Sequence, residues 1–288
     1  MWASITRLHS SPRVGQRFQA RRLAPEPEQA DPRDSLGPPQ EAPLLKRPVL
    51  LVHGFNSGPG AWEGLRTWLT RGGLNKDGGV VQAETAEIDP EGRVFSMQFS
   101  RACNPVSVNA QELRQAIDHI TSATGSPEVD IVAHSKGGLD TRWYLDQGDE
   151  KVEKFVMMAT PNHGSQLANL SLALRQRGMA IAPGSPDPHI RQALIDCRQT
   201  SGSSNPWLDQ LNNNWNRQRQ RADILLISGQ GRPTLTGRLK LTLKGDGVVS
   251  EQSVLMPDVP SRCIRSADHS SVKNHPQALQ ATAAFLVG

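Results

Sequence analysis

The chain has 288 residues, of which 36% are hydrophobic, 5% aromatic and 21% charged, and its formal net charge is +4 at pH 7. No stretch approaches the roughly 18–20 consecutive apolar residues of a membrane-spanning helix. The positive charge lies in residues 1–25, which hold five arginines and no acid, so the rest of the chain carries a net charge of −1. Because that remainder lacks basic runs interleaved with aromatic residues, the composition argues against a nucleic-acid partner.

Residues 1–47 are predicted to form a leader outside the folded domain. They begin with an arginine-rich segment that lacks the apolar core of a secretory signal. Seven prolines then fall within residues 24–48, which is typical of an extended linker. We expect a disordered basic leader and proline-rich linker over 1–47, and one domain over 48–288. The missing Sec-type signal favours a cytoplasmic protein, with organelle import through the Arg-rich N-terminus or non-Sec secretion as alternatives.

Short apolar runs alternate with helical patterns after residue 48. Strands are predicted at 48–52, 94–99, 129–133, 155–159, 224–227 and 263–265, with a strand-like run at 239–243. Helices are predicted at 61–69, behind a capping box formed by Asn109 and Glu112, and after Pro276. This order predicts an α/β fold with a mostly parallel, doubly wound sheet and helices on both faces.

Residues 165–221 interrupt this alternation. Their apolar spacing predicts two or three amphipathic helices inserted between strands. The insertion is interpreted either as ordinary helical packing or as a lid over a hydrophobic site, and the spacing favours neither.

Ser135 lies in the segment Ala133-His134-Ser135-Lys136-Gly137, directly after a predicted strand and before a helical pattern. A nucleophile elbow occurs in this context, and its tight turn requires small residues two before and two after the serine. Ala133 and Gly137 meet that requirement. We expect Lys136 to contribute only its backbone N–H, with its side chain in solvent.

A second turn follows the first predicted strand at His53-Gly54-Phe55. Such a turn can direct the Phe55 backbone N–H toward the elbow. Together with the Lys136 N–H it would form an oxyanion hole, in which losing one donor typically lowers the rate by ~10²–10³.

A serine nucleophile on this type of sheet is followed in the chain by an acid and then a histidine. Asp246 lies in a glycine-flanked loop, and His269 precedes the last predicted helix. The rival acids are Asp258, a turn residue between prolines, and Asp268, whose side chain is expected to point away from its neighbour His269. The rival base is His275, which abuts Pro276 and is expected to cap the final helix.

These motifs, together with Ala159-Thr160-Pro161-Asn162-His163-Gly164-Ser165, resemble those of the α/β-hydrolase lipases and esterases, in particular bacterial triacylglycerol-lipase-like serine hydrolases. The resemblance spans about residues 48–286. It implies an α/β-hydrolase fold, Ser135 as nucleophile, His269 as base, Asp246 as acid, Phe55 and Lys136 as oxyanion donors, and a lid or cap after Pro161.

Two departures from that family limit what the resemblance implies. Calcium-dependent relatives carry a ligand Asp two residues after the histidine, where this chain has Ser271, so no calcium site and no other metal or cofactor is expected. Their disulfide cysteine six residues after the acid is replaced by Gln252. Cys103, Cys197 and Cys263 are therefore expected to be reduced, with a Cys197–Cys263 bridge as the alternative.

The resemblance implies hydrolysis of carboxylic esters through an acyl-enzyme, with an ester or lipid substrate that can lie at a lipid interface. Thioesterase, phospholipase and polyester depolymerase chemistry on the same residues are the alternatives, as is a non-catalytic binding protein of the same fold. The sequence predicts no oligomeric state.

Overall fold

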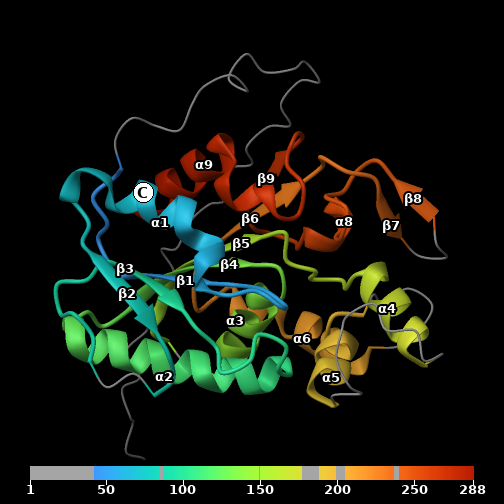
Figure 1. Ribbon diagram of the computed structural model, residues 1–288, viewed down its shortest axis with the longest axis horizontal. Coiled ribbons are helices and arrows are strands. Elements are labelled where there is room, and N and C mark those ends of the chain that lie inside the picture. Colours follow the sequence, from blue (N-terminus) through green and yellow to red (C-terminus); the bar gives the residue numbers. More distant parts are fainter. Residues whose placement is uncertain (1–41, 85–86, 149, 177–187, 199–204, 237–239) are drawn as a thin grey trace, which may run out of the picture.

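The computed structural model describes residues 42–84, 87–148, 150–176, 188–198, 205–236 and 240–288 (Figure 1). Its centre is a seven-stranded sheet in the order β2-β3-β1-β4-β5-β6-β9. Every neighbouring pair in this sheet is parallel, which confirms the predicted parallel arrangement. The strands are β1 Val49–Val52, β2 Asp77–Val81, β3 Val94–Met97, β4 Val129–His134, β5 Val152–Met158, β6 Asp223–Gly229 and β9 Ser261–Ile264.

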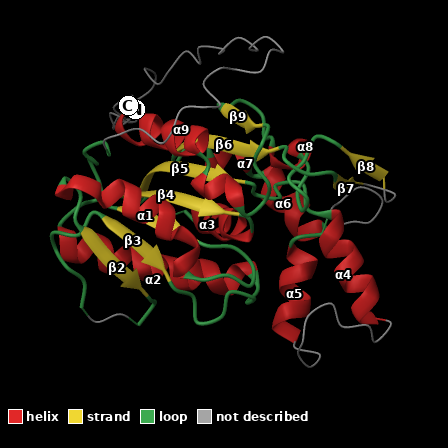
Figure 2. Cartoon of the chain, turned by 45° about the horizontal axis from the view of Figure 1, so that its top comes forward, coloured by secondary structure: helices red, strands yellow, loops and turns green. Residues whose placement is uncertain are grey.

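Helices cover both faces of the sheet (Figure 2). One face packs against α2 (Val106–Thr124) and α3 (Lys136–Asp146), and the other against α1 (Glu63–Thr70) and α9 (Pro276–Val287). Short 3-10 helices at Pro59–Trp62, Arg71–Gly73 and Ser271–Asn274 complete these connections. The doubly wound arrangement predicted from the alternation of strands and helices is therefore present.

The core consists of two layers, one on each side of the sheet. Leu50 and Val52 of β1 belong to the cluster with α2 and α3, whereas Val49 and Leu51 belong to the cluster with α1 and α9. All four side chains are fully buried, because successive residues of a strand point to opposite faces. This explains why the central strands appear in the sequence as unbroken apolar runs.

The start of α2 differs from the prediction. The helix begins at Val106 after Pro105, three residues before the expected capping box. Asn109 is buried inside the helix, and Glu112 accepts hydrogen bonds from the backbone N–H (2.7 Å) and hydroxyl (2.5 Å) of Ser100. The Val106 N–H donates instead to the Asp196 carboxylate at 2.9 Å, so the cap comes from a segment far along the chain.

The described part of the insertion contains four helices, where the sequence predicts two or three. The first three lie beyond the carboxyl ends of the strands (Figures 1 and 2), whereas the fourth lies beside α3 (Figure 2). A hairpin of β7 (Thr234–Thr236) and β8 (Lys240–Thr242) lies at the same end, and α8 (Glu251–Val254) precedes β9. The insertion helices are α4 Gln166–Gln176, α5 Pro188–Asp196, α6 Pro206–Asn213 and α7 Trp215–Gln218.

Three further points concern the N-terminal segment, β2 and the helices. Of the predicted leader, residues 1–41 lie outside the described residues, whereas Leu45 is buried and its N–H donates to the Asn75 side-chain oxygen at 2.9 Å. β2 is absent from the sequence prediction because its Asp-Gly-Gly start has low β-propensity. Among the helices in the described ranges, none combines the length and the apolar character needed to cross a bilayer.

Candidate active site

Ser135 occupies the sharp turn between β4 and α3. Its backbone has φ 55° and ψ −128°, in a region that residues with a side chain rarely adopt. The turn is held by the Ser135 N–H, which donates to the Met158 carbonyl at 2.9 Å. Strain of this kind persists only where the surrounding structure enforces it, and it is concentrated at functional sites.

Two glycines allow this turn to pack against the end of β1. A Cβ at Gly137 would lie 2.5 Å from the His53 carbonyl oxygen, and one at Gly54 would lie 2.8 Å from the Ser135 Cβ. Neither position leaves room for a side chain. β1 and β4 are neighbours at the point where the strand order reverses, which is where open α/β sheets bind their ligands.

The structure brings Ser135, His269 and Asp246 into one hydrogen-bonded chain. The Ser135 hydroxyl lies 3.0 Å from His269 Nε2, and His269 Nδ1 lies 2.8 Å from Asp246 Oδ2. The Asp246 carboxylate is buried and its other oxygen accepts the N–H groups of Val248 (2.9 Å) and Val249 (2.7 Å). These contacts fix the carboxylate and thereby the orientation of the imidazole ring.

The rival residues have other partners. The Asp268 carboxylate accepts backbone N–H bonds from the turn that follows it and lies 3.1 Å from the Arg232 guanidinium, which together lower its pKa to about 2. Asp258 is an exposed turn residue paired with Arg219 at 3.6 Å. His275 caps α9, as predicted from its position before a proline.

The residues expected to supply backbone N–H groups to an oxyanion hole are Phe55 and Lys136. Lys136 is the first residue of α3, and the first N–H groups of a helix have no acceptor within it. Phe55 follows Gly54, whose backbone lies against the Ser135 side chain. Both residues therefore follow adjacent strands, Phe55 after β1 and Lys136 after β4.

The expectation that the Lys136 side chain lies in solvent is wrong. It is 1% exposed, and its ammonium group lies 2.7 Å from the Asp140 carboxylate, which is equally buried. Burial raises the pKa of Asp140 to about 6, although Lys136 opposes this shift. The sequence did not reveal the burial of Lys136, because the first position of a helix is usually exposed. Here α2 and α5, which are distant in the sequence, cover it.

His134 is a further residue beside the triad-like chain. Its Nε2 lies 2.6 Å from the His269 carbonyl oxygen, and the two rings lie 4.7 Å apart. Burial, reinforced by the neighbouring His269, holds the pKa of His134 well below its usual value, so the ring is neutral and donates from Nε2. Its position directly before Ser135 in the chain is the one local signal for this role.

Arg142 of α3 links the site to the insertion, a role that the sequence did not reveal. Its fully buried guanidinium donates to Asn162 Oδ1 (3.0 Å), Asn212 Oδ1 (2.9 Å) and the Leu211 carbonyl (3.2 Å), and to Gln218 Oε1 (2.8 Å). Burial lowers the pKa of Arg142 to about 9. Asn162 belongs to the loop after β5, so this arginine fixes that loop and α6 to the elbow helix.

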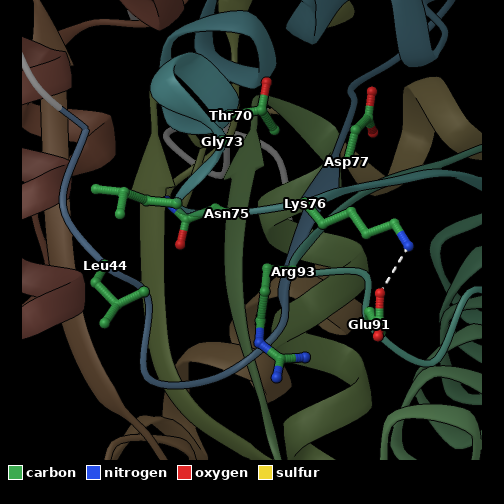
Figure 3. A pocket seen from close by; sticks show the side chains of 9 residues that line it. Leu44, Thr70, Gly73, Asn75, Lys76, Asp77, Glu91 and Arg93 are labelled. Carbon is green, nitrogen blue, oxygen red and sulfur yellow. Dashed lines mark hydrogen bonds and ion pairs between the residues drawn. The ribbon is translucent and has the colours of Figure 1, made fainter.

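Other features of the described residues lie outside this chain of contacts. An open hollow of about 700 Å³ includes Leu44, Lys76 and Arg93, which precede β1, β2 and β3, so it lies at the edge of the sheet opposite to Ser135 (Figure 3).

No group of three or more His, Cys, Asp or Glu side chains in the described ranges is arranged to hold a metal ion. Cys103, Cys197 and Cys263 are all described and are free, so Cys197 and Cys263 are not bridged.

A family model described as a domain of unknown function, DUF7379, matches residues 16–174. The chain belongs to this family. Curated relatives include the triacylglycerol lipase of Pseudomonas fragi, 26% identical over 147 residues, which are 51% of this chain and 43% of that protein. The triacylglycerol lipase of Pseudarthrobacter phenanthrenivorans is 24% identical over 128 residues, 42% of this chain and 35% of that protein. The chain thus spans less than half the length of these relatives.

Solved structures share the fold of this member of the DUF7379 family. The mature lipase BlEst2 of Bacillus licheniformis has a TM-score of 0.60 at 17% identity, covering 87% of this chain and 96% of that one. A metagenomic carboxyl esterase, MGS0156, has a TM-score of 0.56 at 17% identity, covering 92% and 81%. The phospholipase PlaB of Legionella pneumophila has a TM-score of 0.56 at 16% identity, covering 83% and 59%. The predicted α/β-hydrolase fold and the resemblance to bacterial lipases and esterases are confirmed.

Proposed function

We propose that this protein is a serine hydrolase that cleaves carboxylic esters through an acyl-enzyme. The observation that carries the proposal is the continuous chain from Asp246 through His269 to Ser135, with separations of 2.8 and 3.0 Å. A histidine within hydrogen-bond reach of a hydroxyl, and oriented by a buried carboxylate, is the arrangement that activates a serine nucleophile. The similarity of this chain to bacterial triacylglycerol lipases supports carboxylic esters as the substrate class.

In the proposed reaction, Ser135 Oγ attacks the ester carbonyl carbon while His269 Nε2 takes the hydroxyl proton. The resulting tetrahedral intermediate collapses as that proton passes to the alkoxide, so the alcohol leaves and the acyl group remains on Ser135. Water then attacks the acyl-enzyme with His269 as base, which releases the acid and restores the hydroxyl. Asp246 holds the Nδ1–H tautomer and stabilises the imidazolium formed in each step.

The oxyanion of each intermediate is assigned to the backbone N–H groups of Phe55 and Lys136. Backbone donors suit this role because they are fixed before the reaction and need no reorganisation. The buried Lys136 side chain strengthens the assignment, since its ion pair with Asp140 anchors the first turn of α3 and with it the Lys136 N–H.

The insertion helices are proposed to cap the acyl-binding side of the site. Leu139 of α3 packs with Leu208 and Leu211 of α6 in one apolar cluster beside the elbow helix. These side chains are fully buried and hold α6 against the elbow helix, and the preference for an acyl chain is supported by the similarity to triacylglycerol lipases.

The test is hydrolysis of p-nitrophenyl butyrate and palmitate by the wild type, Ser135→Ala, His269→Ala and Asp246→Asn. We expect each substitution to lower kcat by about 10⁴-fold or more. The matched controls are His275→Ala and Asp258→Asn, which remove the rival base and acid and are expected to leave kcat within about twofold. Asn is well tolerated at Asp258 because its φ is 60°.

Three outcomes would refute parts of this proposal. Undiminished activity in Ser135→Ala would exclude Ser135 as the nucleophile. Labelling of Ser135 by a fluorophosphonate probe without turnover of either ester would support Ser135 as an activated nucleophile but exclude these esters as substrates. Thioesters and phospholipids would then be assayed. Absence of both labelling and turnover would favour a binding protein of the same fold.

A further inference from the structure

The β7–β8 hairpin presents the most exposed large apolar side chains in the described part of the chain. Leu241 of β8 is 70% exposed, and Leu243, just after the strand, is 79% exposed. Leu241 belongs to β8 and Leu243 to the bend that directly follows it, so the two leucines lie close together at this end of the hairpin. Nothing in the described structure covers them, and large exposed apolar groups held together in this way commonly mark an interaction site.

The charge on this segment has a single sign. Residues 224–245 contain Arg232, Arg238, Lys240 and Lys244 and no aspartate or glutamate. Lys240 and Lys244 flank the exposed leucines and are themselves exposed. Neither ammonium group forms an ion pair with a carboxylate among the described residues, whereas Arg232 pairs with Asp268 at 3.1 Å. The leucines are therefore bordered by two positive charges that no described acid neutralises.

The base of the hairpin is joined to the loop that carries Asp246. The Arg232 N–H donates to the Gly245 carbonyl at 3.1 Å, and the Gly247 N–H donates to the Thr234 hydroxyl at 2.7 Å. An extended chain advances at most ~3.6 Å per residue, so Leu241 lies within roughly 18 Å of Asp246. Figures 1 and 2 show the hairpin beyond the carboxyl ends of the strands, beside α4.

We propose that the β7–β8 hairpin docks this protein on an anionic lipid surface. Leu241 and Leu243 enter the acyl region, and Lys240 and Lys244 bind the anionic headgroups. This combination of apolar and basic side chains is the one by which peripheral proteins hold an anionic membrane surface. Two leucine side chains cover only a fraction of the roughly 800 Å² that each partner of a stable protein interface buries, which favours lipid over a second protein.

Docking through this hairpin goes beyond the proposed hydrolysis and does not depend on it. It would bring the carboxyl edge of the sheet, where Ser135 lies, to the lipid surface. The docking residues contact none of Ser135, His269 or Asp246 through any described hydrogen bond, so binding and turnover can be measured separately.

The experiment is sedimentation of the full chain with sucrose-loaded vesicles of phosphatidylcholine and phosphatidylglycerol in equal parts, and of phosphatidylcholine alone. We expect Leu241→Ser with Leu243→Ser to weaken binding to the anionic vesicles by on the order of 10-fold or more. Lys240→Glu with Lys244→Glu is expected to weaken it by at least about 20-fold, at roughly fivefold per cation lost, and added salt should weaken wild-type binding.

Matched controls lie at the opposite edge of the sheet. Leu44 and Leu74 are 65% and 56% exposed, and Leu44→Ser with Leu74→Ser should leave vesicle binding unchanged. Lys46→Glu with Arg71→Glu changes the net charge by as much as Lys240→Glu with Lys244→Glu does, and it should weaken vesicle binding far less. Hydrolysis of soluble p-nitrophenyl butyrate should be unaltered in all four double variants, and thermal unfolding verifies that each one is folded.

Three results would overturn the docking proposal. They are a wild type that does not sediment with anionic vesicles, hairpin variants that bind as well as the wild type, and control variants that lose binding equally. A wild type that instead forms dimers abolished by Leu241→Ser with Leu243→Ser would make the hairpin a protein interface. Vesicle binding without any esterase activity would leave the docking proposal standing and refute the proposed function.

Discussion

The buried ion pair of Lys136 and Asp140 makes a sharp prediction, because the chain contains an exposed pair of the same chemistry. Lys136 Nζ and Asp140 Oδ1 are 2.7 Å apart with both side chains 1% exposed. Lys151 Nζ and Asp118 Oδ1 are 2.6 Å apart, but those side chains are 46% and 52% exposed. We expect Lys136→Met to destabilise the fold strongly and Lys151→Met to have almost no effect.

The magnitude follows from the geometry. At 2.7 Å and an effective dielectric constant of ~20, the attraction within the Lys136–Asp140 pair is about 6 kcal/mol, and desolvation of both groups offsets much of it. Removing only the lysine leaves a buried carboxylate without its counter-charge, which typically lowers the free energy of unfolding by about 3–5 kcal/mol. Removing Lys151 should lower it by less than about 1 kcal/mol, because water screens exposed pairs.

The pH dependence identifies the cause. Burial already raises the pKa of Asp140 from 3.8 to about 6, and Lys136 opposes that shift, so Lys136→Met should raise the pKa further. A carboxyl group whose folded-state pKa is raised loses stability as the pH rises from its unfolded pKa to the folded one, and the loss then stops. The wild type completes this loss near pH 6, whereas the variant continues to lose stability above it. The effect of Lys136→Met should therefore be small at pH 5, where Asp140 is protonated, and should grow by about 1.4 kcal/mol per pH unit from pH 6 up to the raised pKa of Asp140 in the variant.

The assay is urea unfolding of the wild type and both variants at pH 5 and pH 8. Lys136→Met combined with Asp140→Leu should recover most of the stability at pH 8, since an apolar pair leaves no isolated charge. Equal losses from Lys136→Met and Lys151→Met, or a loss from Lys136→Met that is the same at both pH values, would refute the reasoning.

Two further predictions concern the packing around Ser135. His134→Phe should lower kcat for the soluble ester by about 10-fold with little change in KM, because the His269 carbonyl loses the hydrogen-bond donor that fixes its loop. His134→Gln should restore part of kcat, and the pH profile of kcat should keep its shape because His134 is neutral throughout. Gly138→Ala should destabilise the fold by about 1–3 kcal/mol in thermal unfolding, despite the better helix propensity of alanine, because its Cβ would clash with the Thr160 side chain. Thr160→Ala combined with Gly138→Ala should remove most of that loss.

The sequence predicts those parts of the molecule whose determinants are local. The elbow needs a strand, a serine between small residues and a helix, and all three lie within one short segment around Ser135. The apolar runs of the central strands are equally local, because both of their faces are buried. Asp246 and His269 required the order of residues along the chain and a family resemblance, since no local feature joins residues 23 positions apart.

What the sequence failed to predict depends on contacts between distant segments. The capping box at Asn109 and Glu112 is a valid local pattern, yet α2 starts earlier because Asp196, 90 positions away, accepts the Val106 N–H. The same distant packing buries Lys136, which any local rule assigns to solvent on a helix start. In both cases a polar side chain acquired a buried partner that only the folded chain supplies.

These distant contacts also restrict how the insertion can move. Asp196 ties the end of α5 to the start of α2, and the Ser165 N–H donates to the Cys197 carbonyl at 2.8 Å, so both ends of the α4–α5 segment are fixed. Arg142 holds α6 through the Leu211 carbonyl. Breaking these buried bonds would leave charged groups without partners, which is strongly unfavourable. The start of α4, the Asp196 end of α5 and the Leu211 turn of α6 therefore belong to the rigid frame of the site.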